Sequence, residues 1–299
     1  MPLRDWLKAL FVVTVWGLNF VAIRLALDDF PPMLLGAMRF ILVALPAVLF
    51  IPRPSVSWRA VAGYGVTISM GQFMFLFTGI YLGMPAGLAS LVLQSQAFFS
   101  VLIGALFLKE RVRLVNIIGM LIASLGLALI YTSGLPGSIP FIGFMLTLLA
   151  ALSWASGNII IKVAGKTDML SLVVWSSLIP PIPFLMLSWW LEGPELISSS
   201  FANVSMVGVI SVGYLVFIST MMGFVTWGRL LHTHPVRKIA PLSLLIPVVG
   251  LISASIFLDE YLTSWQWLGG LVALFGLGVN IQADRLYLKK GGAARATLK

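Results

Sequence analysis

The amino-acid sequence predicts an all-α membrane protein in which ten transmembrane helices form two inverted five-helix repeats. Three observations lead to this fold class: the composition, the length of the apolar runs, and a similarity between the two halves of the chain. Of the 299 residues, 60% are hydrophobic and 10% are charged, and the mean hydropathy is +1.04. This leaves too little polar surface to cover a water-soluble globule, so we expect most of the chain to lie in a bilayer.

Apolar runs of about 20 residues are long enough to cross the bilayer core as helices. We place such spans at residues 7–27, 32–51, 61–82, 85–108, 114–133, 141–163, 169–191, 204–227, 239–258 and 265–283. The first run follows Arg4 and Lys8 and could be mistaken for a signal peptide. Because this run carries one side of an internal repeat, we interpret it as a retained span.

Charged residues alternate between the predicted loops. The 19 Lys and Arg residues fall in one set of loops and at the chain ends, with the exception of Arg24 and Arg39. The other set of loops is acidic and holds Asp28, Asp29, Glu192, Glu195, Asp259 and Glu260. By the positive-inside rule, this pattern predicts that both termini lie in the cytoplasm.

The two halves of the chain resemble each other. A shift of 150 residues aligns most of each half, and a shift of 138 aligns the start, so roughly twelve extra residues lie between Lys162 and Tyr214. The aligned pairs include Gly63-Tyr64 with Gly213-Tyr214, Glu110 with Glu260, and Trp16 with Trp154. Since each copy has an odd number of spans, the second copy must be inverted. We assign residues 1–133 to the first five-helix repeat, 141–283 to the second, and 284–299 to a cytoplasmic tail.

Small residues recur along one face of the fifth and tenth spans. They are Gly119, Ala123 and Gly126 in the fifth, and Gly269, Ala273 and Gly276 in the tenth. Small residues at this spacing let helix backbones approach closely in lipid, so we expect each face to pack against a neighbouring helix.

Several kinds of site are excluded. The net charge of +9 does not indicate nucleic-acid binding, because the basic residues are scattered between spans. The chain has no cysteine, which excludes disulfides and thiolate metal sites, and Ile160 replaces the first glycine that a P-loop requires. We therefore expect no cofactor and no metal. The expected partners are a small-molecule substrate and the lipid bilayer, and the chain could act as a monomer or a homodimer.

Polar side chains inside apolar spans are the candidates for a functional site, because each costs free energy unless it finds a partner. Arg39 lies roughly 10 Å from the acidic end of its span. A guanidinium there suits a substrate carboxylate, and snorkelling to the interface is the alternative. Gln72 and Gln94 are predicted to face the same lumen, the alternative being a hydrogen bond between helices.

Two further pairs lie one turn apart near the middle of the first and sixth spans: Trp16 with Asn19, and Trp154 with Asn158. An inverted two-fold axis brings equivalent positions towards the same level from opposite sides. We therefore expect both pairs to line the central path, with packing between helices as the alternative.

Three segments carry a family resemblance: WGLNF at 16–20, GMPAGLASLVLQSQ at 83–96 and APLSLLIPVVG at 240–250. They resemble the EamA-type proteins of the drug/metabolite transporter superfamily, over nearly the whole chain. The resemblance implies ten helices in two inverted halves, a central cavity between them, and peripheral fifth and tenth spans. It also implies export of small amino acids of the cysteine and O-acetylserine kind across the inner membrane.

The combined features predict a secondary transporter of the inner membrane that exports small amino acids or related metabolites by alternating access. The spans contain no Asp, Glu or His to carry a proton, so we expect movement to follow the substrate's own gradient. Transport of another small amphipathic metabolite or drug is the main alternative, because a fold does not fix a substrate. A membrane-embedded enzyme is less favoured, since the spans lack a catalytic constellation.

Overall fold

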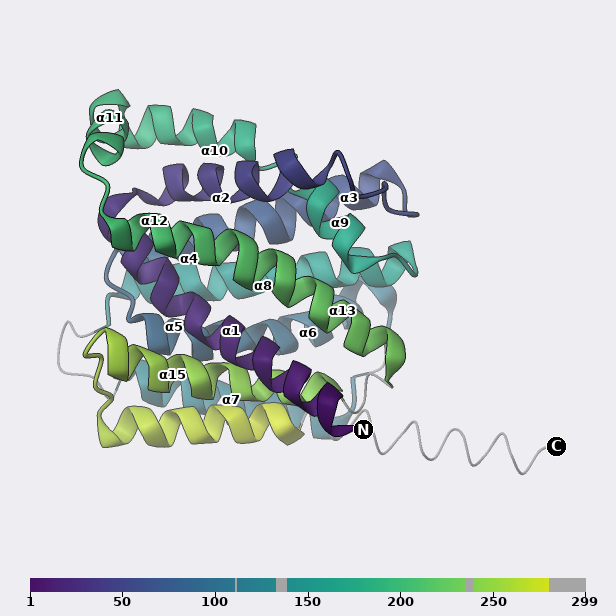
Figure 1. Ribbon diagram of the computed structural model, residues 1–299. Helices are drawn as coiled ribbons and strands as arrows, with labels where there is room; N and C mark the ends of the chain where they lie inside the picture. Colours follow the sequence, from purple (N-terminus) through teal and green to yellow (C-terminus); the bar gives the residue numbers. More distant parts are fainter. Residues whose placement is uncertain (111, 133–138, 235–238, 280–299) are drawn as a thin grey trace.

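The computed structural model describes residues 1–110, 112–132, 139–234 and 239–279, which form a bundle of helices (Figure 1). The first half contributes α1 (Leu3–Asp29), α2 (Pro32–Ala47), α3 (Trp58–Tyr64), η1 (Gly65–Gln72), α4 (Phe73–Tyr81), α5 (Ala86–Val92), η2 (Leu93–Ser95), α6 (Gln96–Leu108) and α7 (Leu114–Thr132). The second half contributes α8 (Phe141–Ala164), α9 (Met169–Ser176), α10 (Pro181–Leu187), η3 (Ser188–Glu192), α11 (Pro194–Ala202), α12 (Met206–Gly213), η4 (Tyr214–Met222), α13 (Gly223–Thr233), η5 (Ala240–Leu245), α15 (Ile246–Phe257) and a final apolar helix, Ser264–Val279. The described residues contain no strand, in agreement with the all-helical fold class.

Seven helical segments in the described part of the chain are long and apolar enough to cross a membrane. They are Leu3–Asp29, Trp58–Tyr81, Ala86–Leu108, Leu114–Thr132, Phe141–Ala164, Met169–Glu192 and Met206–Leu230. Three shorter apolar helices accompany them, at Pro32–Ala47, Leu242–Phe257 and Ser264–Val279. The chain is therefore a multi-pass membrane protein, whereas the count of ten spans stays a prediction.

Charged residues lie at the two opposite ends of the bundle. We call one the acidic end, which carries Asp29, Glu192 and Glu260; α11 lies there, on the left of Figure 1. The opposite, basic end lies on the right of Figure 1 and includes the N-terminus. The loops and helix ends on that side contain Arg4, Lys8, Arg53, Arg59, Lys109, Arg113, Lys162, Lys166 and Arg229. The alternation of charge between loops thus corresponds to a separation of charge in space.

The matching helices α1 and α8 run in opposite directions through the bundle. α1 runs from the N-terminus at the basic end to Asp29 at the acidic end. α8 starts where Gly143 packs against Met84 near the acidic end, and it finishes near Lys162, which pairs with Glu110 at the basic end. The first helices of the two halves are therefore antiparallel.

The two halves also share departures from regular α-helix. The π-helical segments η1 and η4 occupy equivalent places under the 150-residue shift, and so do the 3-10 segments η2 and η5. Lys109 and Asp259 both have left-handed backbone, with φ of 54° and 53°. The amides that follow them, of Glu110 and Glu260, each donate at 3.3 Å to a carbonyl in the preceding helix. The repeat therefore extends to the path of the backbone.

The seventh predicted span is not one continuous helix. α9 ends at Ser176 and α10 begins at Pro181, because the prolines at 180, 181 and 183 lack the amide hydrogens that a helix requires. The segment 169–192 covers 24 residues, whereas α2 has 16. This longer, broken path explains most of the twelve-residue slip between the two alignments.

Three further boundaries differ from the prediction. α2 ends at Ala47, directly after Pro46, instead of continuing to residue 51. The ninth span starts as the 3-10 segment η5 and becomes an α-helix only from Ile246. α11 was not predicted: Gly193, with a φ of 82°, ends η3 and starts this separate helix at the acidic end.

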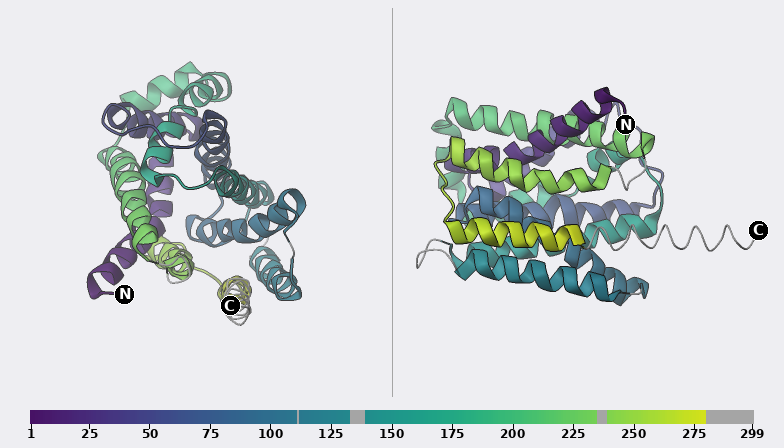
Figure 2. Two further views of the ribbon diagram at one scale, coloured as in Figure 1. Left: turned by 90° about the vertical axis from the view of Figure 1, so that its right-hand side faces the viewer. Right: turned by 90° about the horizontal axis from the view of Figure 1, so that it is seen from below.

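The predicted close packing of small residues is confirmed. A Cβ built on Gly126 would lie 2.4 Å from the Ala273 amide nitrogen, and one on Gly276 would lie 2.6 Å from that of Ala123. α7 and the helix Ser264–Val279 therefore pack backbone against backbone, and Figure 2 shows them side by side at the edge of the bundle. The remaining helices surround the central apolar core, in which Ile23, Phe77 and Leu215 are fully buried.

Candidate functional site

A cavity of about 100 Å³ lies at the centre of the bundle. Its lining combines four polar, non-aromatic side chains of the first half and Ser219 of the second half with aromatic rings from both halves. The lining residues are Trp16, Asn19, Phe20, Arg39, Tyr64, Ile68, Gln72, Phe73, Leu76, Leu93, Gln94, Trp154, Ser219, Phe224 and Ile246. Six of the seven residues that the sequence singled out, all except Asn158, contribute to this wall.

Irregular helical segments supply much of the polar wall. Gln72 is the last residue of the π-helical η1, Gln94 is the middle residue of the 3-10 segment η2, and Ser219 lies in the π-helical η4. Departures of this kind change which face of a helix a side chain occupies, and they occur frequently at functional sites. The irregular segments therefore turn polar side chains towards the cavity, although the helices that contain them otherwise face lipid and apolar neighbours.

Arg39 is buried, with 2% of its surface exposed. Its Nη2 donates to Thr220 Oγ1 at 3.0 Å, and its guanidinium carbon lies 4.2 Å from the centroid of the Phe73 ring. Nε and Nη1 are buried and have no hydrogen-bond partner. Snorkelling to the interface is therefore wrong for Arg39. The residues lining the cavity include no carboxylate, so nothing in this wall neutralises the guanidinium.

Gln72 and Gln94 are 5% and 6% exposed. Gln72 Oε1 is a buried acceptor that has no hydrogen-bond partner among the described residues, and both side chains line the cavity. A buried polar atom without a partner costs about 1–3 kcal/mol. Gln72 Oε1 therefore does not form the hydrogen bond between helices that was the alternative, and it is available to a bound molecule.

Trp16 and Asn19 are held in place by η4 of the other half. Trp16 Nε1 donates to the Ser219 carbonyl at 3.0 Å, and Ser219 Oγ donates to Asn19 Oδ1 at 2.7 Å. The indole ring also lies 5.3 Å from the rings of Phe224 and Trp227, between centroids. These contacts fix one cavity wall by joining the two halves.

Asn158 does not line the central cavity, contrary to its expected position. Its Nδ2 donates to Gln96 Oε1 at 3.1 Å in a separate polar pocket at the basic end, beside Glu110 and Lys162. Trp154, one turn earlier, does line the cavity. The two residues lie one turn apart in α8, which packs against α6, but only Trp154 reaches the central cavity.

Ser219, Thr220 and Phe73 are site residues that sequence reasoning missed. Ser219 and Thr220 form a polar pair inside an otherwise apolar span, which was an available signal. Phe73 directly follows Gln72, and its contact with Arg39 depends on the π-helical turn that η1 introduces before it. The sequence alone does not give that turn.

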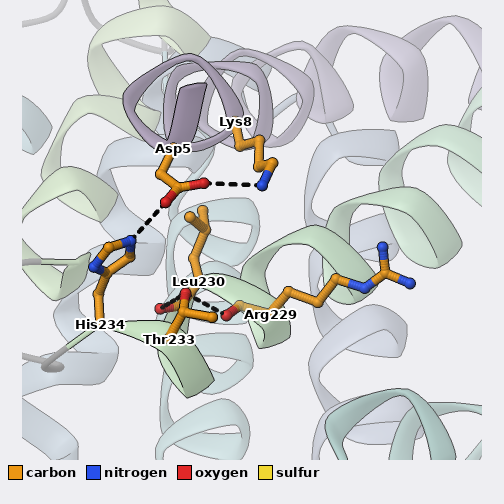
Figure 3. A network of polar contacts seen from close by, with 6 residues as sticks. All are labelled: Asp5, Lys8, Arg229, Leu230, Thr233 and His234. Atoms are coloured by element: carbon orange, nitrogen blue, oxygen red, sulfur yellow. Dashed lines mark hydrogen bonds and ion pairs between the residues drawn. The ribbon is translucent and has the colours of Figure 1, made fainter. Parts of the chain in front are cut away.

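A larger cavity of about 870 Å³ opens at the basic end. Its lining includes Lys166, Asp168 and Arg229, and Phe224 lines both this vestibule and the central cavity. Nearby, Asp5 accepts from Lys8 Nζ and from His234 Nε2, each at 2.9 Å, which links α1 to the end of α13 (Figure 3). The central cavity and the vestibule thus meet at Phe224.

Comparison with known proteins gives the family. The model of the EamA-like transporter family matches residues 6–132 and again 141–282. A protein of Salmonella typhimurium described as a probable amino-acid metabolite efflux pump is 47% identical over 96% of this chain and 97% of its own length. A protein of Escherichia coli with the same description is 46% identical, over 94% and 96% of the two chains.

One solved crystal structure has the same fold, with a TM-score of 0.63 at 18% identity over 96% of this chain and 99% of that one. The duplicated family match covers both halves that the internal repeat defines. A transporter in the bacterial inner membrane follows from the family and the apolar helices together. The chain belongs to the EamA-like transporter family.

Proposed function

We propose that the protein is a secondary transporter that exports small amino acids or related metabolites, of the cysteine and O-acetylserine kind, by alternating access. The observation that carries this proposal is Arg39, a buried guanidinium whose Nε and Nη1 have no hydrogen-bond partner, at a cavity whose lining includes no carboxylate. A planar guanidinium binds a carboxylate through two parallel hydrogen bonds, which no lysine can reproduce. A carboxylate-bearing substrate therefore supplies the missing counter-charge.

The rest of the wall suits the other parts of an amino acid. The side-chain amides of Gln72 and Gln94 offer oxygen acceptors for an ammonium group. The rings of Trp16 and Trp154 cover the apolar part of the cavity, on which a short side chain can lie. The volume of about 100 Å³ is below the roughly 300–1,000 Å³ of pockets for drug-sized ligands, so a small substrate is favoured.

The proposed cycle depends on two inverted five-helix halves with ten spans in all. The antiparallel course of α1 and α8 and the equivalent π-helical segments support this arrangement. The basic end lies in the cytoplasm by the positive-inside rule. The vestibule of about 870 Å³ at that end supports a cycle in which substrate loads from the cytoplasm.

Counterflow in liposomes tests the proposed function directly. Purified protein is reconstituted with unlabelled cysteine, O-acetylserine, serine or alanine inside, and entry of the labelled compound is followed. Faster entry than in liposomes without protein is expected for at least one of these small amino acids. Equal entry for the whole panel, with protein verified in the membrane, contradicts the proposal.

Energy coupling is tested in the same liposomes. The lining of the central cavity includes no Asp, Glu or His, so we propose that export follows the substrate gradient without proton exchange. Counterflow should proceed equally with and without an imposed pH gradient. Concentrative uptake that needs the gradient and stops with an uncoupler contradicts this part of the proposal alone.

A different amphipathic metabolite is a second candidate, and the aromatic lining favours it. Tyr64, Phe73, Trp154 and Phe224 all contribute to the cavity, and aromatic rings bind flat apolar groups well. Phenylalanine and tryptophan in the counterflow panel separate the two candidates. Counterflow with these compounds and not with the small amino acids favours the second candidate.

A further inference from the structure

Three carboxylates at the acidic end each bind the half of the protein to which they do not belong. They are Asp29, from the first half, and Glu192 and Glu260, from the second. Each accepts hydrogen bonds from the start of a helix, and each is only partly exposed. Backbone amides at a helix start are otherwise unpaired, and carboxylates there also interact favourably with the helix dipole.

Glu192, the last residue of η3, holds the start of α2. Its Oε1 accepts from the Met33 amide at 2.6 Å, and its Oε2 accepts from the Leu34 amide at 3.1 Å. Ser188 Oγ donates to the same Oε2 at 2.6 Å, which orients the carboxylate. α2 carries Arg39 less than two turns further on.

Glu260 holds the start of α5 in the same way. Its Oε1 accepts from the Ala86 amide at 2.8 Å, and its Oε2 accepts from the Gly87 amide at 2.9 Å. α5 continues into η2, which brings Gln94 to the central cavity. This carboxylate therefore fixes a helix that ends at the cavity wall.

Asp29 holds the start of α12. Its Oδ2 accepts from the Ser205 amide at 3.1 Å and from Ser205 Oγ at 2.5 Å, while Ser205 Oγ also caps the helix by accepting from the Gly208 amide at 3.0 Å. α12 continues into η4, which carries Ser219 and Thr220. All three carboxylates thus hold helices that lead to residues at the central site.

We propose that Asp29, Glu192 and Glu260 form a carboxylate latch that closes the acidic end, and that its release opens the central cavity towards that end. The latch joins the two halves at three places at the acidic end. At the basic end, which contains the open vestibule, the contacts between the halves include the exposed pair Lys162–Glu110 and the contact of His234 with Asp5. Because each latched helix carries part of the cavity wall, a change at the site and release of the latch are mechanically linked. The proposed latch does not depend on the identity of the substrate, so it goes beyond the proposed function.

Cysteine accessibility tests the latch without any transport measurement. The chain has no cysteine, so a single Leu76→Cys reporter in the cavity wall, on the side towards the acidic end, is the only thiol. Its labelling by a membrane-impermeant maleimide is followed in sealed vesicles of both orientations. Labelling of an Asp28→Cys marker, which is exposed, identifies the orientation that presents the acidic end.

Glu192→Gln and Glu260→Gln should each raise the labelling rate of the reporter from the acidic end by about tenfold, because a lost charge-assisted contact shifts the equilibrium by that order. Glu195→Gln is the matched control. Glu195 is exposed in the first turn of α11 at the same end, and it should leave the rate unchanged. Ser205→Ala is a milder variant that weakens the Asp29 contact without changing any charge, and a smaller increase is expected.

An increase in the latch variants but not in Glu195→Gln supports the proposal. The proposal is overturned if the reporter is labelled from the acidic end at the wild-type rate in all three variants, Glu192→Gln, Glu260→Gln and Ser205→Ala, while labelling from the basic end is normal. An equal increase in Glu195→Gln also overturns it, because a general loosening of the acidic end would then be the cause. The labelling rates do not depend on whether the protein transports amino acids. The latch and the proposed export function can therefore be contradicted independently.

Discussion

Glu110 and Glu260 occupy equivalent places in the two halves, and yet they have different partners. Each follows a residue in left-handed backbone and closes the same 3.3 Å contact to the helix before it. Glu260 accepts from the two amides at the start of α5, whereas Glu110 pairs with Lys162 Nζ at 2.7 and 2.9 Å. The duplicated backbone path therefore supports different contacts at the two ends.

The central site shows the same contrast: the backbone is repeated in both halves, but the polar side chains at the cavity are not. Arg39 has Ser177 as its counterpart under the 138-residue shift, and Ser177 is buried and donates to the Val173 carbonyl at 2.6 Å. Asn19 faces the cavity, and Asn158 does not. The residues that we propose for substrate binding are thus concentrated in the first half, on a scaffold that both halves share.

The largest effect is expected from replacing Arg39, the charge that the second half lacks. Arg39→Gln should lower transport at least tenfold, because the counter-charge for a carboxylate is lost. Arg39→Lys should also impair it, since an ammonium cannot form two parallel hydrogen bonds. Initial counterflow rates at equal protein amounts give both values. Near-normal rates for both variants contradict a substrate role for Arg39.

The second effect concerns the shared scaffold, where α7 meets the helix Ser264–Val279. Gly276→Ala should destabilise the protein by about 1–3 kcal/mol, because the new Cβ would lie 2.6 Å from backbone atoms that cannot move aside. Gly278→Ala, in the same helix but with open space around it, is the matched control and should be neutral or stabilising. Thermal unfolding in detergent distinguishes the two. Equal melting temperatures for both variants contradict the packing argument.

Much of the fold could be predicted from sequence because lipid leaves few options for a polar group. Arg39, Gln72 and Gln94 were found as polar residues in apolar spans, and all three line the central cavity. The internal repeat is visible because residues such as Glu110 and Glu260 recur at one spacing, and these two also share the same local backbone. That Arg39, Gln72 and Gln94 bind substrate is a separate proposal.

Other features depend on tertiary structure that periodicity does not encode. The π-helical η4 changes which face Ser219 presents, so a regular helical projection gives the wrong side. Asn158 shares a face with Trp154 but lies beyond the cavity, since depth depends on how α8 crosses its neighbours. The contact of Glu192 with the start of α2 joins residues 159 positions apart, and no local pattern announces it.

A third prediction compares the two asparagines. Asn19→Ala should lower transport several-fold, because Ser219 Oγ loses its acceptor and the wall around Trp16 loosens. Asn158→Ala should stay within about twofold of the wild type, since its single contact with Gln96 is exposed and outside the cavity. Counterflow rates at matched expression test both. If both variants lose the same share of the counterflow rate, the assignment of the central cavity as the substrate site is contradicted.

The smallest effect returns to the two glutamates. Glu110 and Lys162 are exposed, with 47% and 53% of their side-chain surfaces accessible, and exposed ion pairs contribute about 0.2–1 kcal/mol. Glu110→Gln should therefore change the free energy of unfolding by less than about 1 kcal/mol. Glu260→Gln should cost more, about 1.5–3 kcal/mol, because two backbone amides lose a charged acceptor in a partly buried place. Thermal unfolding of both variants in the same detergent measures the difference. If Glu110→Gln is as costly as Glu260→Gln, the two ends are equally closed, and the contrast between them is lost.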